Sequence, residues 1–329
     1  MRPRLRGPRR ISRTARFLFV RRRALTQHRR MSVLDRLVAA ALPITPRFVI
    51  GRVARRYIAG ETIDSAMRAI RELNAKGVDA TVDVLGEFIT DISEARATAA
   101  EYGRVLDAIA AEKLRANVSI KLTAFGLGLE ETACRGLVAD LARAAAAKVG
   151  FLRVDMENTP YTDRTLALVR ALRSEGLPVG VVLQAYLRRT DADAAALAAE
   201  GVPVRLCKGI YRESAEVAFH DREEIRESYR RNLRTLLAGK AKVAIATHDE
   251  VLVQHAFRLI EEMKPAKEHY EFQMLLGVRE RLREEIVGRG HAVRVYVPFG
   301  KAWYGYSTRR LRENPAIAGH VFKAMFGGG

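Results

Sequence analysis

Cysteine is scarce in this sequence. Only Cys134 and Cys207 occur among the 329 residues, so a disulfide-rich scaffold is excluded and a reducing compartment is expected. A thiolate zinc site needs more ligands than two cysteines supply, and we predict no bound metal. Long apolar runs are also missing. None approaches the roughly 20 residues that span a bilayer, so we expect a cytoplasmic protein without a membrane-spanning segment.

Acidic residues are absent from the first 30 positions, which contain twelve Arg. Removing these twelve from the formal net charge of +19 leaves +7 for the other 299 residues. The basic excess therefore belongs to this segment and says little about the rest of the chain. We interpret residues 1–30 as a disordered basic extension or as sequence upstream of a true start at Met31. A transit-like segment, or one that binds RNA or anionic lipid, is the alternative.

Short β-prone runs recur from about residue 80 onward, separated by Ala-, Arg- and Glu-rich stretches with helical periodicity. The runs are residues 80–87, 118–122, 151–157, 179–186, 204–211, 242–249, 270–277 and 292–299, and helical stretches include 94–112, 132–148, 191–200 and 250–263. Alternation of strand and helix favours parallel pairing, and eight such units favour a closed (β/α)8 barrel of the TIM type. A doubly wound open sheet is the alternative, disfavoured because no GxGxxG follows the first run.

Three regions are predicted. They are the basic segment 1–30, N-terminal helices over residues 31–79 with a break at Pro43 and Pro46, and the barrel over residues 80–329. Glycines stand just before several strands, where the end of a helix favours a left-handed residue. These are Gly150, Gly176, Gly201 and Gly290.

Charged residues interrupt several of the apolar runs. Lys121 lies in VSIKL and Arg205 in VRLCK, and a buried charge is costly unless it finds a partner or a ligand. Catalytic groups of such barrels cluster at the carboxyl ends of the strands. We therefore take as candidates the polar side chains in or just after the eight runs. They are Glu87, Lys121, Thr123, Asp155, Glu157, Gln184, Tyr186, Arg205, Lys208, Thr247, His248, Asp249, Gln273 and Tyr296.

Two adjacent arginines follow the last run, in a segment that is predicted to begin a helix near Tyr304. Arg309 and Arg310 diverge by roughly 100° on a helix, yet both can reach one small anion near its start. Guanidinium groups bind carboxylates bidentately, so the doublet suits a substrate carboxylate. Tyr306 shares a face with Arg310. The alternative interpretation of the doublet is a solvated basic face.

Several segments resemble motifs of the proline dehydrogenase family. RLCKGIY at residues 205–211 is similar to the RLVKGAY motif, and FQML followed by Gly277 to the FQMLxG element. RVYVPFG at residues 294–300, with Tyr306, RRL and ENP further on, resembles the C-terminal signature. Shorter matches are SIKLT, VDME, LQAY and TH on the intervening runs. The resemblance covers residues 35–326 in the expected order, which chance rarely produces; Ile210 and Leu276 depart from the commoner residues.

The resemblance implies a distorted barrel that binds FAD at its carboxyl face, with a C-terminal helix over the mouth. The implied reaction oxidises L-proline to 1-pyrroline-5-carboxylate by hydride transfer from C5 to the flavin N5. Asp155 and Arg205 are the implied catalytic residues, Arg205 beside N5 and Asp155 orienting the cations or Tyr296. Implied substrate contacts are Lys121, Leu275, Tyr296, Tyr306, Arg309 and Arg310. Implied cofactor contacts are Val154, Gln184, Arg205, Lys208, Gly209, Ile210, Thr247, His248 and Glu313.

The same resemblance implies membrane quinone as electron acceptor and thus peripheral contact with the inner face of the cell membrane, to which residues 31–42 or the basic tail would contribute. A fused aldehyde dehydrogenase does not fit the length, so a separate pyrroline-5-carboxylate (glutamate semialdehyde) dehydrogenase is expected. A Schiff-base lyase or aldolase using Lys121 or Lys208 remains the enzyme alternative. Nucleic-acid or lipid binding by residues 1–30 is the other alternative, although we expect no nucleic-acid partner.

Overall fold

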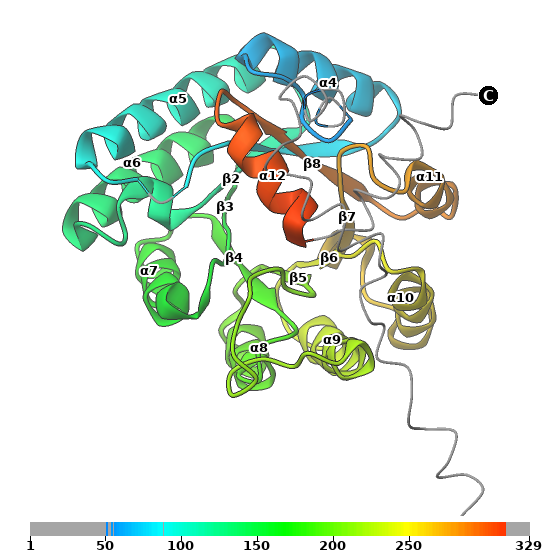
Figure 1. The fold of residues 1–329 in the computed structure, drawn as a ribbon. Coiled ribbons are helices and arrows are strands. Elements are labelled where there is room, and N and C mark those ends of the chain that lie inside the picture. The colour runs from blue at the N-terminus through cyan, green and yellow to red at the C-terminus, as the bar shows by residue number, and fades with distance from the viewer. Residues whose placement is uncertain (1–50, 52–53, 55, 88, 314–329) are drawn as a thin grey trace, which may run out of the picture. The chain divides into compact units, whose positions relative to one another are not determined.

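Eight parallel strands follow one another around a closed barrel in the computed structural model (Figure 1). The structure describes residues 51, 54, 56–87 and 89–313, with side chains as far as residue 308. These residues belong to one compact unit, and element labels follow Figure 1. The predictions for residues 1–30 and for the helices before residue 51 lie outside the described residues.

Each of the eight predicted β-prone runs overlaps one strand, although β1 and β2 begin before their predicted runs. The strands are β1 Asp79–Val84, β2 Ala116–Ile120, β3 Leu152–Val154, β4 Val179–Gln184, β5 Val204–Cys207, β6 Val243–Ala246, β7 Tyr270–Leu275 and β8 Val293–Phe299. Each pairs in parallel with the next, and β8 returns to pair with β1, from Asp79 opposite Arg294 to Val84 opposite Phe299. This closure confirms the predicted barrel and rules out the open doubly wound sheet.

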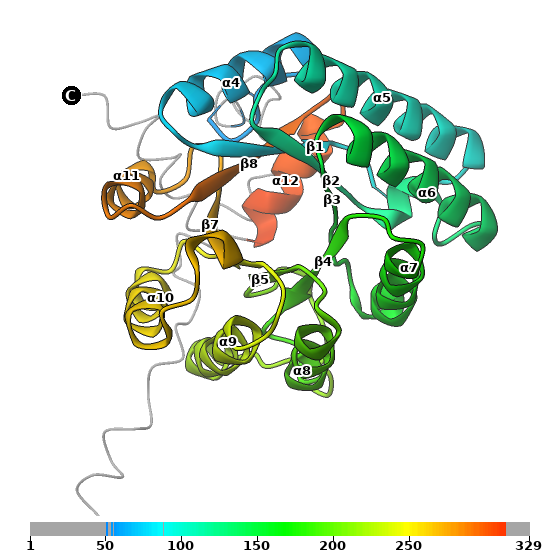
Figure 2. The same cartoon turned by 180° about the vertical axis from the view of Figure 1, so that it is seen from behind.

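Apart from the last helix, α12, the helices cover the outside of the barrel, as both views show (Figures 1 and 2). Their bounds are α4 Ile63–Ala75, α5 Ile92–Ala111, α6 Glu131–Lys148, α7 Thr162–Ser174, α8 Thr190–Glu200, α9 Arg222–Leu237, α10 Glu250–Met263, α11 Glu280–Gly288 and α12 Trp303–Glu313. Short 3-10 helices occupy Leu122–Phe125 (η2), Thr159–Tyr161 (η3) and Lys267–His269 (η4). The four stretches with predicted helical periodicity are α5, α6, α8 and α10.

The local sequence explains where these helices begin and end. Asp91 caps α5, with its side chain accepting from Ser93 N and the Glu94 side chain accepting from Asp91 N, a capping box that satisfies two helix-end amides. The four glycines predicted at helix ends all have φ angles between 69° and 79°, in the left-handed region. Local signals in the sequence therefore set where the helices begin and end, and so the alternation of strands and helices that the barrel needs.

The inner face of this barrel is unusually polar. Strand register places Asp79 opposite Arg294 and Arg294 opposite Gln273, and partners in a parallel pair point to the same face. Small residues on that face make room for the long polar ones: a Cβ at Gly180 would lie 2.7 Å from Nη1 of Arg153. Barrels of this type usually fill the interior with branched apolar side chains, so the polar lining suggests a functional mouth.

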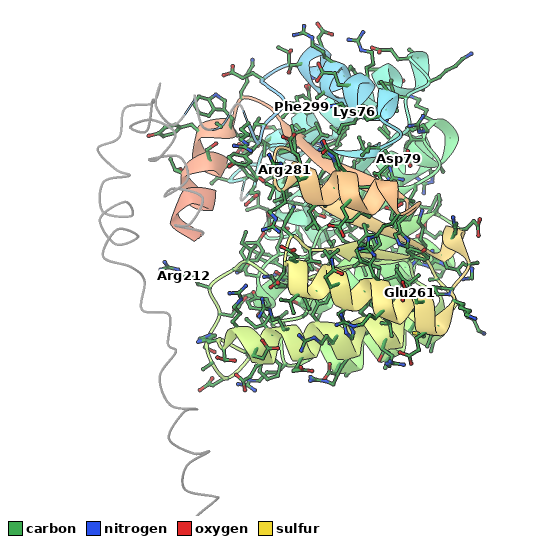
Figure 3. The ribbon with its side chains drawn as sticks, turned by 90° about the vertical axis from the view of Figure 1, so that its right-hand side faces the viewer. Lys76, Asp79, Arg212, Glu261, Arg281 and Phe299 are labelled. Atoms are coloured by element: carbon green, nitrogen blue, oxygen red, sulfur yellow. The ribbon has the colours of Figure 1, made fainter. Side chains whose placement is uncertain are left out.

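The two ends of the barrel differ. Figure 3 shows the barrel from the side, with Asp79 at the start of β1 towards one end and Arg212, in the segment after β5, at the other. Helix α12 lies at that second end, where it crosses the mouth in the view of Figure 1. The helix that the C-terminal motif predicted is therefore at the carboxyl face of the strands.

Candidate active site

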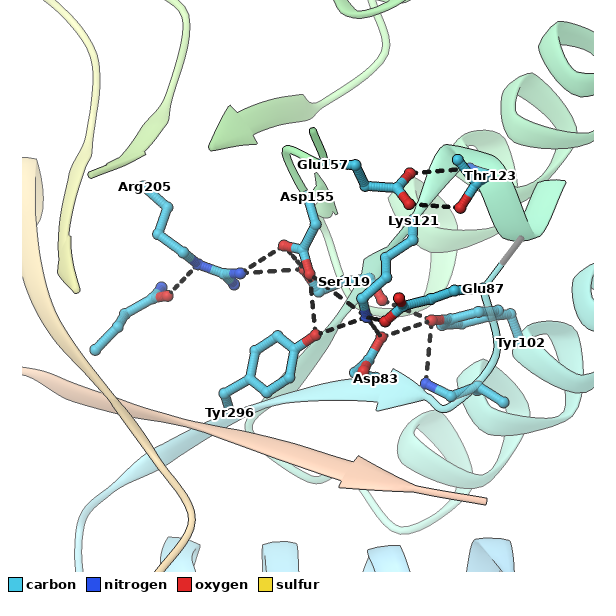
Figure 4. A network of polar contacts seen from close by, with 12 residues as sticks. Asp83, Glu87, Tyr102, Ser119, Lys121, Thr123, Asp155, Glu157, Arg205 and Tyr296 are labelled. Atoms are coloured by element: carbon cyan, nitrogen blue, oxygen red, sulfur yellow. Dashed lines mark hydrogen bonds and ion pairs between the residues drawn. The ribbon is translucent and has the colours of Figure 1, made fainter. Parts of the chain in front are cut away.

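The predicted candidates converge at the carboxyl ends of the strands. Lys121 directly follows β2, Asp155 directly follows β3, Arg205 lies within β5 and Tyr296 within β8. Parallel strands of a closed barrel all end at the same face, so these four side chains meet there although they are far apart in the sequence (Figure 4). All four are largely buried.

Asp155 is the centre of the network. One carboxylate oxygen accepts from Oγ of Ser119 at 2.6 Å and from Nη1 of Arg205 at 2.7 Å; the other accepts from the hydroxyl of Tyr296 at 2.9 Å. Burial would raise the pKa of Asp155, but Arg205, Lys121 and the hydrogen bonds outweigh it and hold the pKa below its usual value. Asp155 is therefore a charged acceptor that fixes the groups around it.

Lys121 is held as an ammonium. Its Nζ lies 2.7 Å from Oδ1 of Asp83 and 3.9 Å from Oε1 of Glu87, and it donates to the hydroxyl of Tyr296 at 3.2 Å. Burial would lower the pKa of Lys121, but the surrounding carboxylates raise it above its usual value. A Schiff base requires a neutral amine. Lys208 is paired with a carboxylate as well, so the lyase or aldolase alternative receives no support.

Asp83 was missed by the sequence analysis. Asp83 lies inside β1 and not at its end, and it is fully buried. Burial raises the pKa of Asp83, although Lys121 opposes the rise. Tyr102 of α5 reaches in from outside, donates to the backbone oxygen of Ser119 at 2.7 Å and accepts from Val84 N at 3.1 Å. A carboxylate among apolar residues in TVDVLG is the same signal that drew attention to Lys121.

Glu157 connects two strand ends beside the network. Its carboxylate accepts from the backbone N of Thr123 at 2.9 Å and from the Thr123 hydroxyl at 2.5 Å, while its backbone oxygen accepts from Nε2 of Gln184 at 2.9 Å. Burial raises the pKa of Glu157 to about 7, although both bonds from Thr123 oppose the rise. The residue therefore clamps the loop after β2 to the loop after β3.

Comparison with known proteins assigns the family. The family described as proline dehydrogenase matches residues 66–323. The chain belongs to the proline dehydrogenase family. Proline dehydrogenase 1 of Bacillus subtilis strain 168 is 37% identical over 273 residues, which cover 83% of this chain and 90% of that protein. Proline dehydrogenase of Deinococcus radiodurans is 36% identical over 282 residues, covering 84% of this chain and 91% of its own.

Solved structures agree with the sequence comparison. Proline utilization A (PutA) of Bdellovibrio bacteriovorus, inactivated by N-propargylglycine, matches with a TM-score of 0.73 at 27% identity, covering 80% of this chain and 32% of that one. A PutA structure with proline bound in remote sites matches with a TM-score of 0.67 at 25% identity, covering 82% and 32%. This chain thus spans about a third of the length of those proteins. The motif-based assignment is confirmed, and membership of the proline dehydrogenase family implies a flavin enzyme.

A second charged group lies on the loops after β5 and β6 and on the first turns of α9. Asp249 caps α10 and accepts from Nε and Nη2 of Arg226 at 3.0 and 2.9 Å and from Nζ of Lys208 at 3.2 Å, with Arg222 at 3.7 Å. Burial would raise the pKa of Asp249, but Arg226 and Lys208 hold it at about 2. Glu223 also pairs with Arg226 at 3.2 Å, so three cations face two carboxylates, and the remaining positive charge suits phosphate. The sequence analysis missed Arg222 and Arg226, because an Arg-rich helix gives no signal of which arginine faces the site.

The remaining cofactor candidates of the barrel lie on β3 and on the loops after β5 and β6. His248 accepts from Leu275 N through Nε2 at 2.9 Å, so the proton of the neutral imidazole is on Nδ1. Thr247 accepts from Asp249 N. Gly209 has a φ of +106°, and a Cβ there would lie 2.1 Å from the Tyr186 ring; only glycine fits. Val154 is buried in β3, and Ile210 is exposed.

Helix α12 contributes Tyr306, whose side chain packs with Ala54, Ile58 and Leu85. Tyr306 lies near enough to Tyr296 to help raise the pKa of that buried phenol, although burial is the largest cause. The side chains of the other predicted α12 residues, Arg309, Arg310 and Glu313, lie outside the described residues.

In the described part of the chain, no cluster of three or more His, Cys, Asp and Glu side chains is arranged to bind a metal. Within the same residues, no helix combines the length and hydropathy needed to cross a bilayer.

Proposed function

We propose that this protein oxidises L-proline to 1-pyrroline-5-carboxylate with FAD as its cofactor, as the first step of proline catabolism. Membership of the proline dehydrogenase family supports the reaction. The observation that carries the proposal is the buried network of Lys121, Asp155, Arg205 and Tyr296 at the barrel mouth. It offers preorganised cations and donors in a place from which water is largely excluded, as charge stabilisation during reaction requires.

The substrate carboxylate needs more positive charge than Lys121 offers. Three carboxylates, of Asp83, Glu87 and Asp155, lie within 4.0 Å of its Nζ, so its charge is already balanced. We therefore assign binding of the substrate carboxylate to Arg309 and Arg310 together with Lys121. The assignment of the doublet rests on the C-terminal motif, and bidentate guanidinium geometry suits it.

Apolar contact with the proline ring is assigned to two tyrosines and a leucine. Tyr296 and Tyr306 have apolar rings and polar tips, and Leu275 ends β7 next to Tyr296 of β8 in the strand register. Nζ of Lys121 lies 5.9 Å from the centre of the Tyr296 ring, and the guanidinium carbon of Arg205 lies 5.4 Å from it. The Tyr296 hydroxyl is also bonded to Asp155 and Lys121, so we expect its ring to form a fixed wall against the substrate.

Asp155 is assigned an orienting role. The proline nitrogen must be neutral when hydride leaves C5, so that its lone pair can assist. A general base works best with a pKa near the operating pH, but the pKa of Asp155 is lowered and its oxygens accept from three donors. Asp155 therefore fixes Arg205 and Tyr296, and the proton leaves by another route.

The donors along β4 to β7 fit a flavin dinucleotide by their chemistry. When bound, the flavin supplies the electron-accepting ring, whose potential the protein tunes through nearby donors and charges. Arg205 and Gln184 would hold the flavin ring. Lys208, with Arg222 and Arg226 around Asp249, would hold phosphate. Val154, Gly209, Ile210, Thr247, His248 and Glu313 complete the proposed set.

The test is spectroscopic. Purified protein, reconstituted with FAD where necessary, should show a flavin spectrum that bleaches when L-proline is added without oxygen. D-proline serves as the control, and o-aminobenzaldehyde traps the expected product. Protein that binds FAD but is not reduced by L-proline, or that never binds FAD, would refute the proposal.

We also propose that electrons pass to membrane quinone through peripheral contact with the inner face of the cell membrane. A separate pyrroline-5-carboxylate (glutamate semialdehyde) dehydrogenase would then consume the product in the cytoplasm. Quinone-dependent turnover and co-sedimentation with anionic liposomes test the first part. Reduced enzyme that neither transfers electrons to a soluble quinone nor pellets with liposomes would contradict it.

A further inference from the structure

Beneath the mouth, the inner face of β7 carries two polar residues that the proposed reaction does not use. Glu271 and Gln273 are two positions apart on one strand, so both point to the same face. Their register partners on β6 are Ala244 and Ala246, and Ala244 in turn pairs with Arg205 of β5. Two alanines between β5 and β7 leave room for long side chains to meet across them.

The side chains do meet. Oε1 of Gln273 accepts from Nε of Arg205 at 2.5 Å, and Nε2 of Gln273 donates to Oε1 of Glu271 at 2.6 Å. Glu271 also accepts from Nε of Arg294 at 2.9 Å, and Nζ of Lys242 lies 2.8 Å from its other oxygen. A buried chain of contacts therefore runs from Arg205 at the mouth down to the opposite end of the barrel, where Lys242 is exposed.

The charge of Glu271 decides which way the amide of Gln273 points. Burial would raise the pKa of Glu271, but Arg294 and Lys242 hold it well below its usual range, so this carboxylate can only accept. The amide nitrogen must face it, which leaves the amide oxygen for Arg205. Amide orientation is often ambiguous, but here the chemistry allows one choice.

Arg205 is thereby fixed from two sides. Gln273 accepts a hydrogen bond from Nε of Arg205, while Asp155 and Ser119 accept from its Nη1 at 2.7 and 3.2 Å. Two anchors on different nitrogens define the plane of a guanidinium group, whereas Asp155 alone would allow it to turn. Among the hydrogen bonds between described residues, none engages Nη2 of Arg205, so this nitrogen remains for a ligand.

We propose that Gln273, oriented by Glu271, is a positioning residue that sets the rotation of Arg205 and so the donor that Arg205 presents to the flavin. This inference rests on the proposed function for its redox consequence. Its geometric content, an immobilised Nε–H on Arg205, is independent of any cofactor and of any reaction.

The decisive variant is Gln273→Leu, which keeps similar volume but removes both the acceptor for Arg205 and the donor to Glu271. Asn232→Leu is the matched control. Asn232 is an equally buried carboxamide on α9 that donates to Asp191 at 2.7 Å, so its loss reports the structural effect of deleting a buried amide away from the site. Both variants are compared with wild type as FAD-loaded protein and as apoprotein.

In the FAD-loaded protein, Gln273→Leu should reduce the rate constant of flavin reduction by L-proline at least about tenfold, as loss of a hydrogen bond to a charged group implies. It should displace the flavin midpoint potential and leave the KM for proline nearly unchanged, since the Gln273 side chain bonds Arg205 and Glu271 and, among the described side chains of the proposed carboxylate site, does not bond Lys121. Asn232→Leu should lower thermal stability without moving rate or potential. A folded, FAD-loaded Gln273→Leu protein with wild-type rate and potential would overturn the proposal.

In the apoprotein, the Nε–H of Arg205, assigned by its loss in Arg205→Lys, should exchange slowly with solvent in wild type and in Asn232→Leu but rapidly in Gln273→Leu. Glu271→Gln is the second variant, because it keeps Gln273 but removes the reason for its orientation; it should also speed the exchange. Unchanged slow exchange in both would overturn the proposal. Failure of wild type to be bleached by proline would refute only the proposed function, because the exchange experiment stands without it.

Discussion

Replacement of Glu157 by Gln should change how stability depends on pH. The pKa of this buried carboxyl is about 7 in the folded protein against an ordinary 4.5. Between these values the folded state binds a proton that the unfolded state releases, so the contribution is fully present below pH 4.5 and is lost as pH rises to 7. A difference of 2.5 corresponds to about 3 kcal/mol at 1.36 kcal/mol for each pKa unit. Wild type should therefore lose about this much stability relative to Glu157→Gln.

The geometry makes the comparison a fair one. Thr123 donates its backbone N to one oxygen of Glu157 and its hydroxyl to the other. In Glu157→Gln the amide oxygen can keep the first bond, and the hydroxyl can turn to accept from the amide nitrogen. The substitution thus removes the titration while the clamp between the two loops stays in place.

Urea unfolding of both proteins from about pH 5 to about pH 8 measures the effect, because every other titrating group is common to the two and cancels in the difference. The stability of Glu157→Gln relative to wild type should rise across this range and level off above about pH 7. A difference that stays constant with pH, or that falls, would refute the reasoning, because it would mean that Glu157 is charged in the folded protein throughout.

Three further substitutions test the site itself. Asp155→Asn keeps the shape but removes the charge that anchors Arg205, so flavin reduction by proline should slow at least about 100-fold, with the loss of a buried pair partner also costing about 3–5 kcal/mol of stability; stopped-flow kinetics with wild-type rates would contradict this. Lys121→Met should raise the KM for proline more than it lowers kcat, and an unchanged KM in steady-state assays would remove Lys121 from the carboxylate site. Gly209→Ala must place a Cβ into the Tyr186 ring at a φ of +106°, so FAD affinity measured by fluorescence titration should fall; wild-type affinity would show that the loop relaxes freely.

The polar interior has a bearing on how the barrel is stabilised. A barrel core is normally filled by branched apolar side chains, whereas here the apolar core lies between the strands and the surrounding helices. Residues such as Val118, Ile120 and Val295 are fully buried on that outer layer. Apolar burial therefore supports the fold from outside the strands, and the interior is available for charged groups that balance one another.

The strand positions could be predicted from the sequence, but the strand ends could not. In the predicted run 204–211 the strand ends at Cys207. In the run 151–157 only Leu152–Val154 form a strand. In both runs the chain leaves the sheet before the predicted run ends. At β5 the departure coincides with the positive φ of Gly209, and at β2 with the start of η2 at Leu122. Strand ends follow from barrel closure and loop geometry, which a periodicity does not contain.

By itself the sequence determined the barrel, the order of its strands, the family, and which charged residues lie at the strand ends, because these follow from local periodicity and from motifs read along the chain. Only the tertiary structure decided the pairing of atoms. Lys121 meets Asp83 and Tyr296 across separations of 38 and 175 residues, and Gln273 meets Arg205 across 68. A strand pattern predicts that a side chain points inward. Closure of the sheet then determines which partner that side chain reaches, and the partner determines the charge that each group carries.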